Sequence, residues 1–361
     1  MPDGRWIFLE PFYGGSHRHL ADGLVEHLPA SIELWSLPAR RWKWRMRGAA
    51  LFFAERWRRE PPPACGILTS SLLDAAALRG LLPPEARSLP LLVYFHENQL
   101  AYPVRTADAR DLHFAWTNIQ SALAADRVLW NSAYNRDSFL SALPDCLRRM
   151  PDAAPMASEA SIRARSEILP VPLDVSGLIA SSRTAAPRTG ACRIVWNHRW
   201  EHDKGPDEFL ETLMELSDAG LDFELLLLGQ RFSRRPELLA RAEAKLGSKI
   251  MISDYMTEKN QYIKELSRCD LVVSTARHEF QGLAVLEAAA CGAVPLVPDD
   301  LGYREIWPAE CRYRRAEFKT SLAGRIREVL AWRGLEYRSF CRPFDWQRLL
   351  PRWAALLGEF A

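Results

Sequence analysis

Two carboxylates, Glu279 and Glu287, stand eight positions apart with Gly282 between them. Apolar runs at 271–274 and 293–297 flank this segment, so the pattern predicts a strand, a loop with Glu279, a helix with Glu287 and a second strand. Ligands of open α/β sheets bind beyond the carboxyl ends of strands, where a helix N-terminus offers N–H groups to a phosphate. A carboxylate there would bind hydroxyls, so the segment indicates a sugar joined to a diphosphate. The alternative is a plain helix whose glutamates face water.

A second motif supplies positive charge. Arg199 and Lys204 lie in the loop predicted after the apolar run at 193–196, before a helix that starts near Pro206. Arginine grips a phosphate with two parallel hydrogen bonds, and lysine acts as a point charge. A solvated loop of mixed charge is the alternative, but the position after a strand favours diphosphate binding.

The first half of the chain has a glycine pair, Gly14 and Gly15, after its first predicted strand. The pair lets backbone approach a ligand closely at the start of a helix. An ordinary tight turn explains it equally well. The segment does not match G-x-G-x-x-G, so a nicotinamide cofactor is not indicated.

Polar side chains end the predicted strand at 91–95. His96, Glu97, Asn98 and Gln99 follow one another there. An unpaired buried polar group costs about 1–3 kcal/mol, so this ending favours a function over a histidine satisfied by nearby carbonyls. His96 would orient a sugar or share a developing charge.

The segment at 40–60 is basic and aromatic. It has eight basic side chains, against Glu55 and Glu60: Arg40, Arg41, Lys43, Arg45, Arg47, Arg56, Arg58 and Arg59. Cations bind phosphates, and exposed tryptophans would stack on unpaired bases. Two alternatives stand beside RNA binding: an amphipathic helix with its aromatic side chains in the core, and a helix on a membrane surface. Composition does not separate the three.

The elements that must position these residues are βα units. Strand-like runs lie at 6–9, 32–35, 66–69, 91–95 and 127–130, and then at 193–196, 223–228, 249–252, 271–273 and 294–297. Helical segments of roughly ten to fifteen residues separate most of them, which predicts α/β architecture with parallel sheets. There are too many strands for one compact sheet. We expect two doubly wound, Rossmann-like domains facing each other across a cleft.

The predicted boundaries follow composition. Residues 1–173 form an N-terminal, acceptor-side domain, 174–190 a linker rich in small residues, and 191–345 a C-terminal domain that binds the nucleotide sugar. A helix at 346–361 is expected to pack back on the first domain. Residues 144–165, rich in Pro, Ala, Ser and Arg, are interpreted as a long surface loop.

Bulk properties exclude several classes. A 361-residue chain with 48% hydrophobic residues and net charge +2 is not strongly basic overall, although a local basic patch is compatible with it. Seven dispersed cysteines, with no Cys-x-x-Cys pair, indicate neither a zinc site nor a disulfide framework. We find no signal peptide and no membrane span, so we expect a cytoplasmic protein. No Asp-x-Asp motif ends a strand, so we expect no metal and metal-independent turnover.

Taken together, these motifs resemble the retaining GT-B glycosyltransferases that use nucleotide sugars. A closer resemblance, over nearly the whole chain, is to the tRNA-queuosine mannosyltransferase family. Members of that family transfer mannose from GDP-mannose onto queuosine in a tRNA anticodon. Three segments carry the closer resemblance: Glu10-x-Phe12-Tyr13-Gly14-Gly15-Ser16-His17, Leu37-Pro38-Ala39-Arg40-Arg41-Trp42-x-Trp44-Arg45, and Tyr94-Phe95-His96-Glu97-Asn98-Gln99-Leu100-x-Tyr102-Pro103.

The resemblance implies roles for individual residues. His96 and Glu279 would act at the donor hexose, Glu279 by contacting its hydroxyls, and Glu287 would bind the ribose. The other implied donor-binding residues are Gly14, Gly15, Arg199, Lys204, Phe280, Gln281, Gly282 and Leu283. The implied acceptor or tRNA contacts are His17, Asn98, Gln99, Arg40, Arg41, Trp42, Lys43, Trp44 and Arg45. Many relatives have Pro and Phe where this chain has Phe280 and Gln281, so sugar discrimination stays open.

The expected reaction moves a hexose from a nucleoside diphosphate with retention at the anomeric carbon. Arg199, Lys204 and backbone N–H groups would stabilise the charge on the leaving diphosphate. The expected partners are a nucleotide sugar and queuosine-containing tRNA, with no further cofactor and no stable membrane insertion. One alternative is a glycosyltransferase acting on a lipid or polysaccharide at the membrane surface, and another is a non-enzymatic binding module. The sequence has no signal for oligomeric state.

Overall fold

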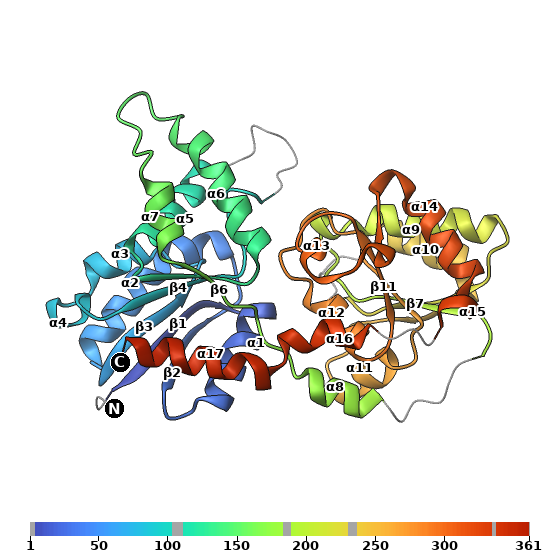
Figure 1. The fold of residues 1–361 in the computed structure, drawn as a ribbon, viewed down its shortest axis with the longest axis horizontal. Coiled ribbons are helices and arrows are strands. Elements are labelled where there is room, and N and C mark those ends of the chain that lie inside the picture. Colours follow the sequence, from blue (N-terminus) through green and yellow to red (C-terminus); the bar gives the residue numbers. More distant parts are fainter. Residues whose placement is uncertain (1–3, 103–110, 183–188, 230–236, 334–336, 361) are drawn as a thin grey trace. The chain divides into compact units, whose positions relative to one another are not determined.

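The computed structural model describes residues 4–102, 111–182, 189–229, 237–333 and 337–360. The chain divides into two compact units (Figure 1). Unit 1 comprises Met1–Pro172 and Gln347–Ala361, and unit 2 comprises Leu173–Trp346. Each unit has a six-stranded sheet in which every described strand pair is parallel. The predicted α/β class with two doubly wound domains is confirmed.

The sheet of unit 1 has the strand order β2-β1-β3-β4-β5-β6. Its strands are β1 (Arg5–Tyr13), β2 (Ile32–Pro38), β3 (Ala64–Ser70), β4 (Leu91–Phe95), β5 (Arg127–Trp130) and β6 (Ser166–Ile168). Its helices are α1 (Gly15–His27), α2 (Trp42–Arg59), α3 (Ala75–Leu81), α4 (Pro84–Arg87), α5 (Leu112–Ala124), α6 (Ala133–Leu147), α7 (Ser158–Ala164) and α17 (Trp346–Glu359). The five strands predicted in this half are confirmed. Sequence analysis missed β6, which is three residues long and has no apolar run.

The sheet of unit 2 has the strand order β12-β11-β10-β7-β8-β9. Its strands are β7 (Cys192–Trp196), β8 (Phe223–Leu227), β9 (Ile250–Ser253), β10 (Leu271–Val273), β11 (Val294–Pro298) and β12 (Arg312–Tyr313). The main helices are α8 (Val175–Ser182), α9 (Pro206–Asp218), α10 (Glu237–Leu246), α11 (Lys259–Leu266), α12 (Leu283–Ala290) and α14 (Phe318–Arg327); the short ones are α13 (Tyr303–Ile306), α15 (Val329–Trp332) and α16 (Arg338–Cys341). All five predicted strands are confirmed, and the two-residue β12 was missed.

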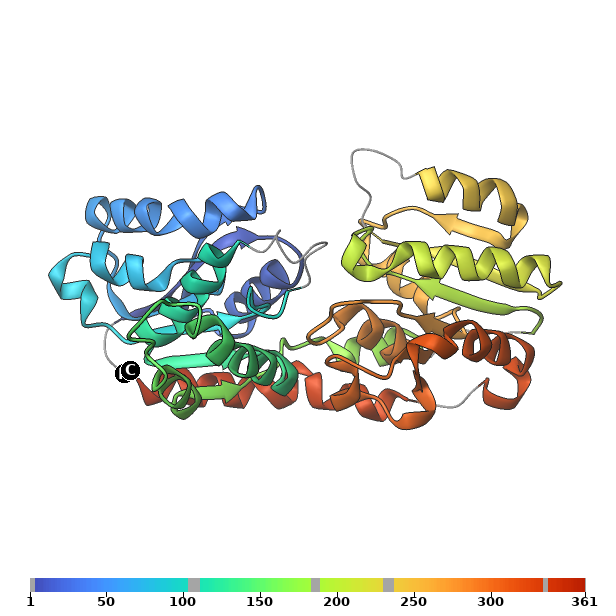
Figure 2. The same ribbon diagram turned by 90° about the horizontal axis from the view of Figure 1, so that it is seen from above.

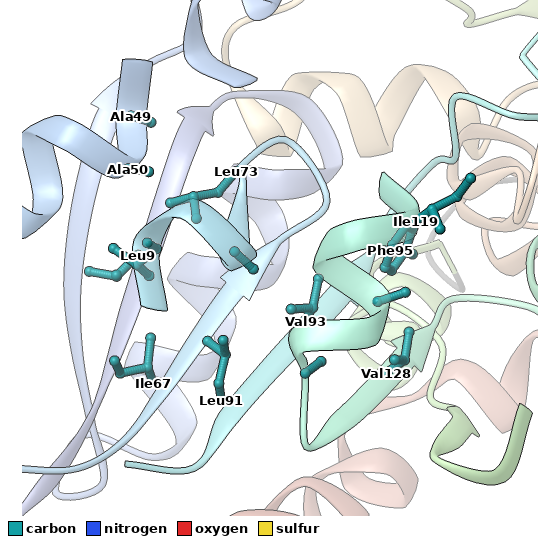
Figure 3. Close-up of a cluster of buried hydrophobic side chains, with 14 of the residues drawn as sticks. Leu9, Ala49, Ala50, Ile67, Leu73, Leu91, Val93, Phe95, Ile119 and Val128 are labelled. Carbon is teal, nitrogen blue, oxygen red and sulfur yellow. The ribbon is translucent and has the colours of Figure 1, made fainter. Parts of the chain in front are cut away.

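The core of unit 1 lies between one face of its sheet and the helices that cover that face (Figure 3). Strand residues Leu9, Ile67 and Val93 meet Ala50 of α2 and Ile119 of α5 there. Both faces of the inner strands are covered, which is why these strands read as continuous apolar runs. Because helices cover both faces, the polar motifs occur at the carboxyl ends of the strands and in the loops that follow them.

Helix α17 belongs to unit 1, and Figure 2 shows it on the opposite side of that unit from α2. Trp353 is buried and stacks on Tyr94 of β4 with ring centroids 5.7 Å apart. Trp6 Nε1 of β1 donates a hydrogen bond to the Leu357 carbonyl at 3.2 Å. The chain therefore returns to the first unit at its C-terminal end. Among the described residues, we find no helix with the length and apolar character needed to cross a bilayer.

Two interpretations of connecting segments need correction. Residues 175–182 of the predicted linker form α8, which belongs to unit 2 and buries Val175 and Leu178. The predicted loop at 144–165 is shorter than expected, because α6 continues to Leu147 with Pro144 inside it and α7 covers Ser158–Ala164. In both segments the small residues suggested a loop, whereas a few buried apolar side chains are enough to stabilise a helix there.

Candidate active site

The loop that carries Glu279 joins β10 to α12 in unit 2, as predicted. Strand β10 ends at Val273, and α12 begins at Leu283 directly after Gly282. Gly282 is left-handed, with a φ of 76°, and a Cβ atom there would lie 2.6 Å from the Tyr303 ring. Glycine meets both conditions, so this residue sets the turn from the loop into the helix.

A buried lysine holds Glu279. Lys204 Nζ donates a hydrogen bond to Glu279 Oε2 at 3.1 Å, and the backbone N–H of Phe280 donates to Oε1 at 3.1 Å. Lys204 Nζ also donates to the His278 carbonyl at 2.9 Å and lies 3.2 Å from Asp203 Oδ2. Burial alone would raise the pKa of Glu279, but the Lys204 charge and the hydrogen bonds from Lys204 and the backbone together outweigh burial and lower that pKa to about 2. Glu279 is therefore an ionised carboxylate at neutral pH.

The two predicted diphosphate-binding cations differ in their surroundings. Arg199 follows β7, and its side chain is 51% exposed and 3.2 Å from Glu201 Oε2. The Lys204 side chain is only 10% exposed and lies between two carboxylates. Arg199 is therefore accessible to a diphosphate, whereas Lys204 lies inside the polar cluster around Glu279. Diphosphate binding by both remains a prediction.

His198 is a site residue that the sequence analysis missed. It lies two positions after the end of β7 and is buried, and its Nε2 has no hydrogen-bond partner within the described part of the chain. Burial, and after it the Lys204 cation, lower the pKa of His198 to about 4. The ring is therefore neutral. Its place between a strand end and Arg199 is the sequence signal that could have identified it.

Glu287 lies in α12, as predicted. Tyr262 Oη of α11 donates a hydrogen bond to Glu287 Oε2 at 3.0 Å, and Asn197 Nδ2 donates to Tyr262 Oη at 2.8 Å. Burial raises the pKa of Glu287 to about 7. The pKa values of the two carboxylates are therefore shifted in opposite directions, because Glu279 has Lys204 at hydrogen-bond distance, whereas burial of Glu287 outweighs its Tyr262 hydrogen bond and the attraction of Lys259. Tyr262 and Asn197 were not predicted.

The remaining predicted donor contacts lie around the same turn. Phe280 and Gln281 are buried in the loop, and the Phe280 ring packs edge-on against His278 at 4.4 Å. Leu283 is partly exposed at the first turn of α12. The structure thus groups all the predicted donor residues of the second half at the carboxyl ends of β7 and β10.

In unit 1, the glycine pair joins β1 to α1. Gly15 is left-handed, with a φ of 54°. A Cβ atom at Gly14 would lie 2.5 Å from Ala39 Cβ, so this position requires glycine for close approach of another loop. The close packing at Gly14 favours the interpretation of the glycine pair as a tight turn. Contact of Gly14 and Gly15 with the donor stays a prediction.

Four polar residues meet where β1 and β4 end. His17 Nδ1 lies 3.2 Å from Glu10 Oε1, and His17 Nε2 lies 3.3 Å from Glu97 Oε2. The His96 ring stacks on His17 with centroids 4.0 Å apart. Both ring nitrogens of His96 are buried and have no hydrogen-bond partner in the described residues. Both nitrogens of His17 are engaged within the protein, and its predicted acceptor contact stays a prediction.

The same cluster is the one group of described residues whose spacing suits a metal ion. Ligand atoms of Glu10, His17 and His96 lie within 4.8 Å of one another. His17, however, already faces a carboxylate with each nitrogen, and its ring is stacked on His96 rather than converging with it. A proton shared between His17 and the carboxylates explains this geometry without a metal.

The side chain of Asn98 is hydrogen-bonded within unit 1. It is fully buried, and its Nδ2 donates to Asn135 Oδ1 at 2.8 Å while its Oδ1 accepts from the Ala101 N–H at 2.8 Å. Asn135 also donates to the Phe95 carbonyl at 2.9 Å. The predicted acceptor contact of Asn98 stays a prediction. The neighbouring Gln99 is partly exposed, and its backbone N–H donates to Asn118 Oδ1 at 2.9 Å.

Helix α2 divides its aromatic residues between the core and the surface. Trp42 packs on Phe114 with ring centroids 5.0 Å apart, whereas Trp44 is 72% exposed. The cations are largely exposed, although Arg45 Nη2 donates to the Pro38 carbonyl at 3.1 Å. Arg40, Arg41 and Lys43 are the exposed basic residues at this end of α2. The predicted amphipathic helix and the predicted exposed tryptophan thus coexist, and of Trp42 and Trp44 it is Trp44 whose ring is exposed for stacking on a ligand.

Solved structures share this architecture over nearly the whole chain. Sucrose-phosphate synthase from Thermosynechococcus elongatus is 15% identical, with a TM-score of 0.70 and 98% of each chain covered. The UDP-forming alpha,alpha-trehalose-phosphate synthase from Burkholderia vietnamiensis is 13% identical, with a TM-score of 0.72 and 99% of each chain covered. A family model described as glycosyl transferases group 1 matches residues 186–332. The protein is therefore a glycosyltransferase with the GT-B fold, as the sequence predicts.

The family follows from the first unit and from a full-length relative. A family model described as tRNA-queuosine alpha-mannosyltransferase N-terminal matches residues 5–173. The tRNA-queuosine alpha-mannosyltransferase of Drosophila melanogaster is 39% identical over 321 residues, which are 87% of this chain and 84% of that protein. The chain belongs to the tRNA-queuosine alpha-mannosyltransferase family. A partial match, 29% identical over 168 residues, is to a GDP-mannose-dependent alpha-(1-6)-phosphatidylinositol dimannoside mannosyltransferase of Mycobacterium tuberculosis.

Proposed function

We propose that this enzyme transfers mannose from GDP-mannose onto queuosine in tRNA, with retention at the anomeric carbon. The observation that carries the proposal is the family match over residues 5–173, because this half of the chain is expected to receive the acceptor. The printed name of the Drosophila relative supports both the sugar and the acceptor. The donor nucleotide is supported by the name of the mycobacterial relative, which specifies GDP-mannose for that protein.

The chemistry of unit 2 suits the donor. Ionised Glu279 accepts hydrogen bonds from hexose hydroxyls, and Glu287 accepts them from the ribose. Arg199 and the N–H groups at the start of α12 neutralise the diphosphate, because both present positive charge at the same strand ends. These donors are fixed before the sugar leaves, so they stabilise the charge that develops on the leaving group. We infer that turnover needs no metal ion and that His96 contacts the sugar.

The surface of α2 suits a nucleic acid. Trp44 is exposed, and Arg40, Arg41 and Lys43 lie within four positions of it and are also exposed. A flat aromatic ring among cations binds an unpaired base together with its phosphate. We therefore assign tRNA contact to Trp44 and these cations, assign Trp42 to the core, and place the reaction in the cytoplasm.

The test is transfer of labelled sugar. The enzyme is incubated with radiolabelled GDP-mannose, or with labelled UDP-sugars, and with total tRNA that contains or lacks queuosine. We expect label only with GDP-mannose and only in queuosine-containing tRNA. The Glu279→Gln variant should lose transfer, whereas Glu211→Gln, which changes an exposed glutamate of the same unit, should keep it. Equal labelling of both tRNA pools would reject the proposed acceptor.

A lipid acceptor at a membrane surface is the second candidate. It is favoured by the name of the mycobacterial relative and by exposed apolar residues on α2, namely Trp44, Leu51 and Phe52. Charge reversal of Arg41 and Lys43 separates the two candidates. With a tRNA acceptor, the double variant should lose tRNA binding and keep hydrolysis of the donor. Mannosylated lipid formed by the wild-type enzyme, without labelled tRNA, would select the second candidate.

A further inference from the structure

The polar cluster at the ends of β1 and β4 contains a histidine whose hydrogen-bond geometry determines its charge. Each ring nitrogen of His17 faces a carboxylate oxygen, Glu10 Oε1 at 3.2 Å and Glu97 Oε2 at 3.3 Å. Ionised carboxylates only accept hydrogen bonds, so both nitrogens must carry a proton. Burial alone would lower the pKa of His17, but the attraction of Glu10 and then of Glu97 outweighs burial and raises that pKa to about 10. His17 is therefore an imidazolium at neutral pH.

The carboxylate of Glu10 is itself held rigidly. It is fully buried, and its Oε1 accepts hydrogen bonds from the Phe12 N–H at 2.8 Å and from Ser70 Oγ at 3.1 Å. Because β1 and β3 are adjacent in the sheet, these contacts fix Glu10 against two strands. A rigid carboxylate gives the His17 ring one orientation.

His96 lies against this cation. The two rings stack at 4.0 Å with 28° between their planes, and Tyr94 packs on the His96 ring at 4.7 Å. The charged or titratable neighbours that shift its protonation are His17 and His19, both on α1. Burial lowers the pKa of His96 well below its usual range, and repulsion from His17 and His19 lowers it further. His96 thus offers one N–H donor and one nitrogen lone pair.

We propose that His17, clamped by Glu10 and Glu97, is a positioning residue that keeps His96 a neutral imidazole oriented toward the substrate hydroxyls. A protonated His96 would have two donors and no acceptor, and it could not accept a hydrogen bond from a hydroxyl. The assignment of substrate contact to His96 rests on the proposed function. The charge states of the two rings do not depend on that function.

The substitution His17→Gln tests this proposal, because glutamine keeps two hydrogen-bonding atoms and removes the positive charge. With the repulsion from His17 gone, the pKa of His96 should rise. The acid limb of the pH profile of kcat/KM should move upward by the same amount. His113→Gln, which changes an exposed histidine of unit 1, is the control and should leave the profile in place.

Nitrogen NMR of the full chain with ¹⁵N-labelled histidine measures the charge states directly. Eight histidines give few signals, and the signals of His17 and His96 are identified by their loss in His17→Gln and His96→Gln. We expect His17 to stay doubly protonated to ~pH 8 and His96 to stay neutral down to ~pH 6. In His17→Gln the His96 signal should titrate at higher pH. If that variant does not fold, Glu97→Gln, which removes one partner of the clamp, should lower the titration midpoint of His17.

Two results would overturn the inference. One is a His17 ring that titrates near the ordinary histidine value of about 6.5. The other is one equivalent of metal in the protein purified without added metal, lost in His17→Gln, because the cluster would then hold an ion in place of the proton. These measurements need no substrate. An absence of mannose transfer would reject the proposed function and leave the charge states as measured.

Discussion

Replacing Glu287 with glutamine should stabilise the protein at neutral and alkaline pH. In the folded protein, burial raises the pKa of Glu287 from 4.5 to about 7. Between those two values the folded state binds more protons at this group than the unfolded state, so stability falls as the pH rises through that window. Glutamine removes this dependence and still accepts the hydrogen bond from Tyr262.

The magnitude follows from the size of the shift. A shift from 4.5 to about 7 corresponds to about 3 kcal/mol at about 1.4 kcal/mol per pKa unit. The variant should therefore gain up to about 3 kcal/mol over the wild-type protein between pH 4.5 and pH 7, with no further gain at higher pH. Under the proposed ribose contact of Glu287, binding of the donor by the wild-type enzyme should strengthen across the same window, because an ionised carboxylate accepts hydrogen bonds from hydroxyls more strongly than a neutral one.

Glu279 is the matched contrast, because its pKa is shifted in the opposite direction. Lys204 lowers the pKa of Glu279 from 4.5 to about 2, so this carboxylate contributes stability above pH 4.5 that is lost as the pH falls toward 2. Glu279→Gln should therefore destabilise the protein by about 3 kcal/mol above pH 4.5. Two similar substitutions eight positions apart thus have opposite expected signs.

The assay is the free energy of unfolding by urea, measured at several pH values for the wild-type protein and both variants. Glu211→Gln is the control, because Glu211 is exposed and paired with Arg241 at 3.1 Å; its effect should stay within about 0.5 kcal/mol. A Glu287→Gln protein whose stability falls between pH 4.5 and pH 7 as steeply as that of the wild type would refute the reasoning.

Three further outcomes are expected. Trp44→Ala should weaken tRNA binding by about 1–3 kcal/mol in a filter-binding assay. Trp42→Ala should instead lower the free energy of unfolding by about 3 kcal/mol. Equal effects of the two variants on tRNA binding would contradict the division of α2 into a buried and an exposed face. Asn135→Ala removes the hydrogen-bond partner of buried Asn98 and should lower the free energy of unfolding by about 1–3 kcal/mol. Both Tm and kcat should fall as a result. An unchanged Tm would show that the Asn98–Asn135 hydrogen bond does not support the loop after β4. EDTA should leave transfer unchanged, and activity lost with EDTA and restored by Mg²⁺ would count against metal-independent turnover.

Most of the fold could be predicted because its strands are buried on both faces. Ten apolar runs identified ten of the twelve described strands. The missed strands, β6 and β12, have three and two residues and too few apolar side chains to form a pattern. The linker was misread for the opposite reason, since residues 175–182 have a small-residue composition and form α8 because Val175 and Leu178 are buried.

The site could be predicted only in part. The sequence analysis located Glu279, Glu287 and Arg199 correctly, because the strands and helices beside them can be recognised from the local sequence. It did not reveal that the Asn98 amide turns inward to Asn135, 37 positions later. An amide at a strand end has the same local pattern whether it faces a ligand or supports a loop.

By itself the sequence determined which residues stand at the carboxyl ends of strands, because alternating apolar and polar segments encode that placement locally. The tertiary structure decided the charge and the availability of those residues. Lys204 meets Glu279 across 75 positions, and His17 meets Glu97 across 80. A pKa depends on burial and on the distance to other charges, and chain folding sets both. The two glutamates eight positions apart therefore look alike in the sequence, but folding lowers the pKa of Glu279 and raises the pKa of Glu287.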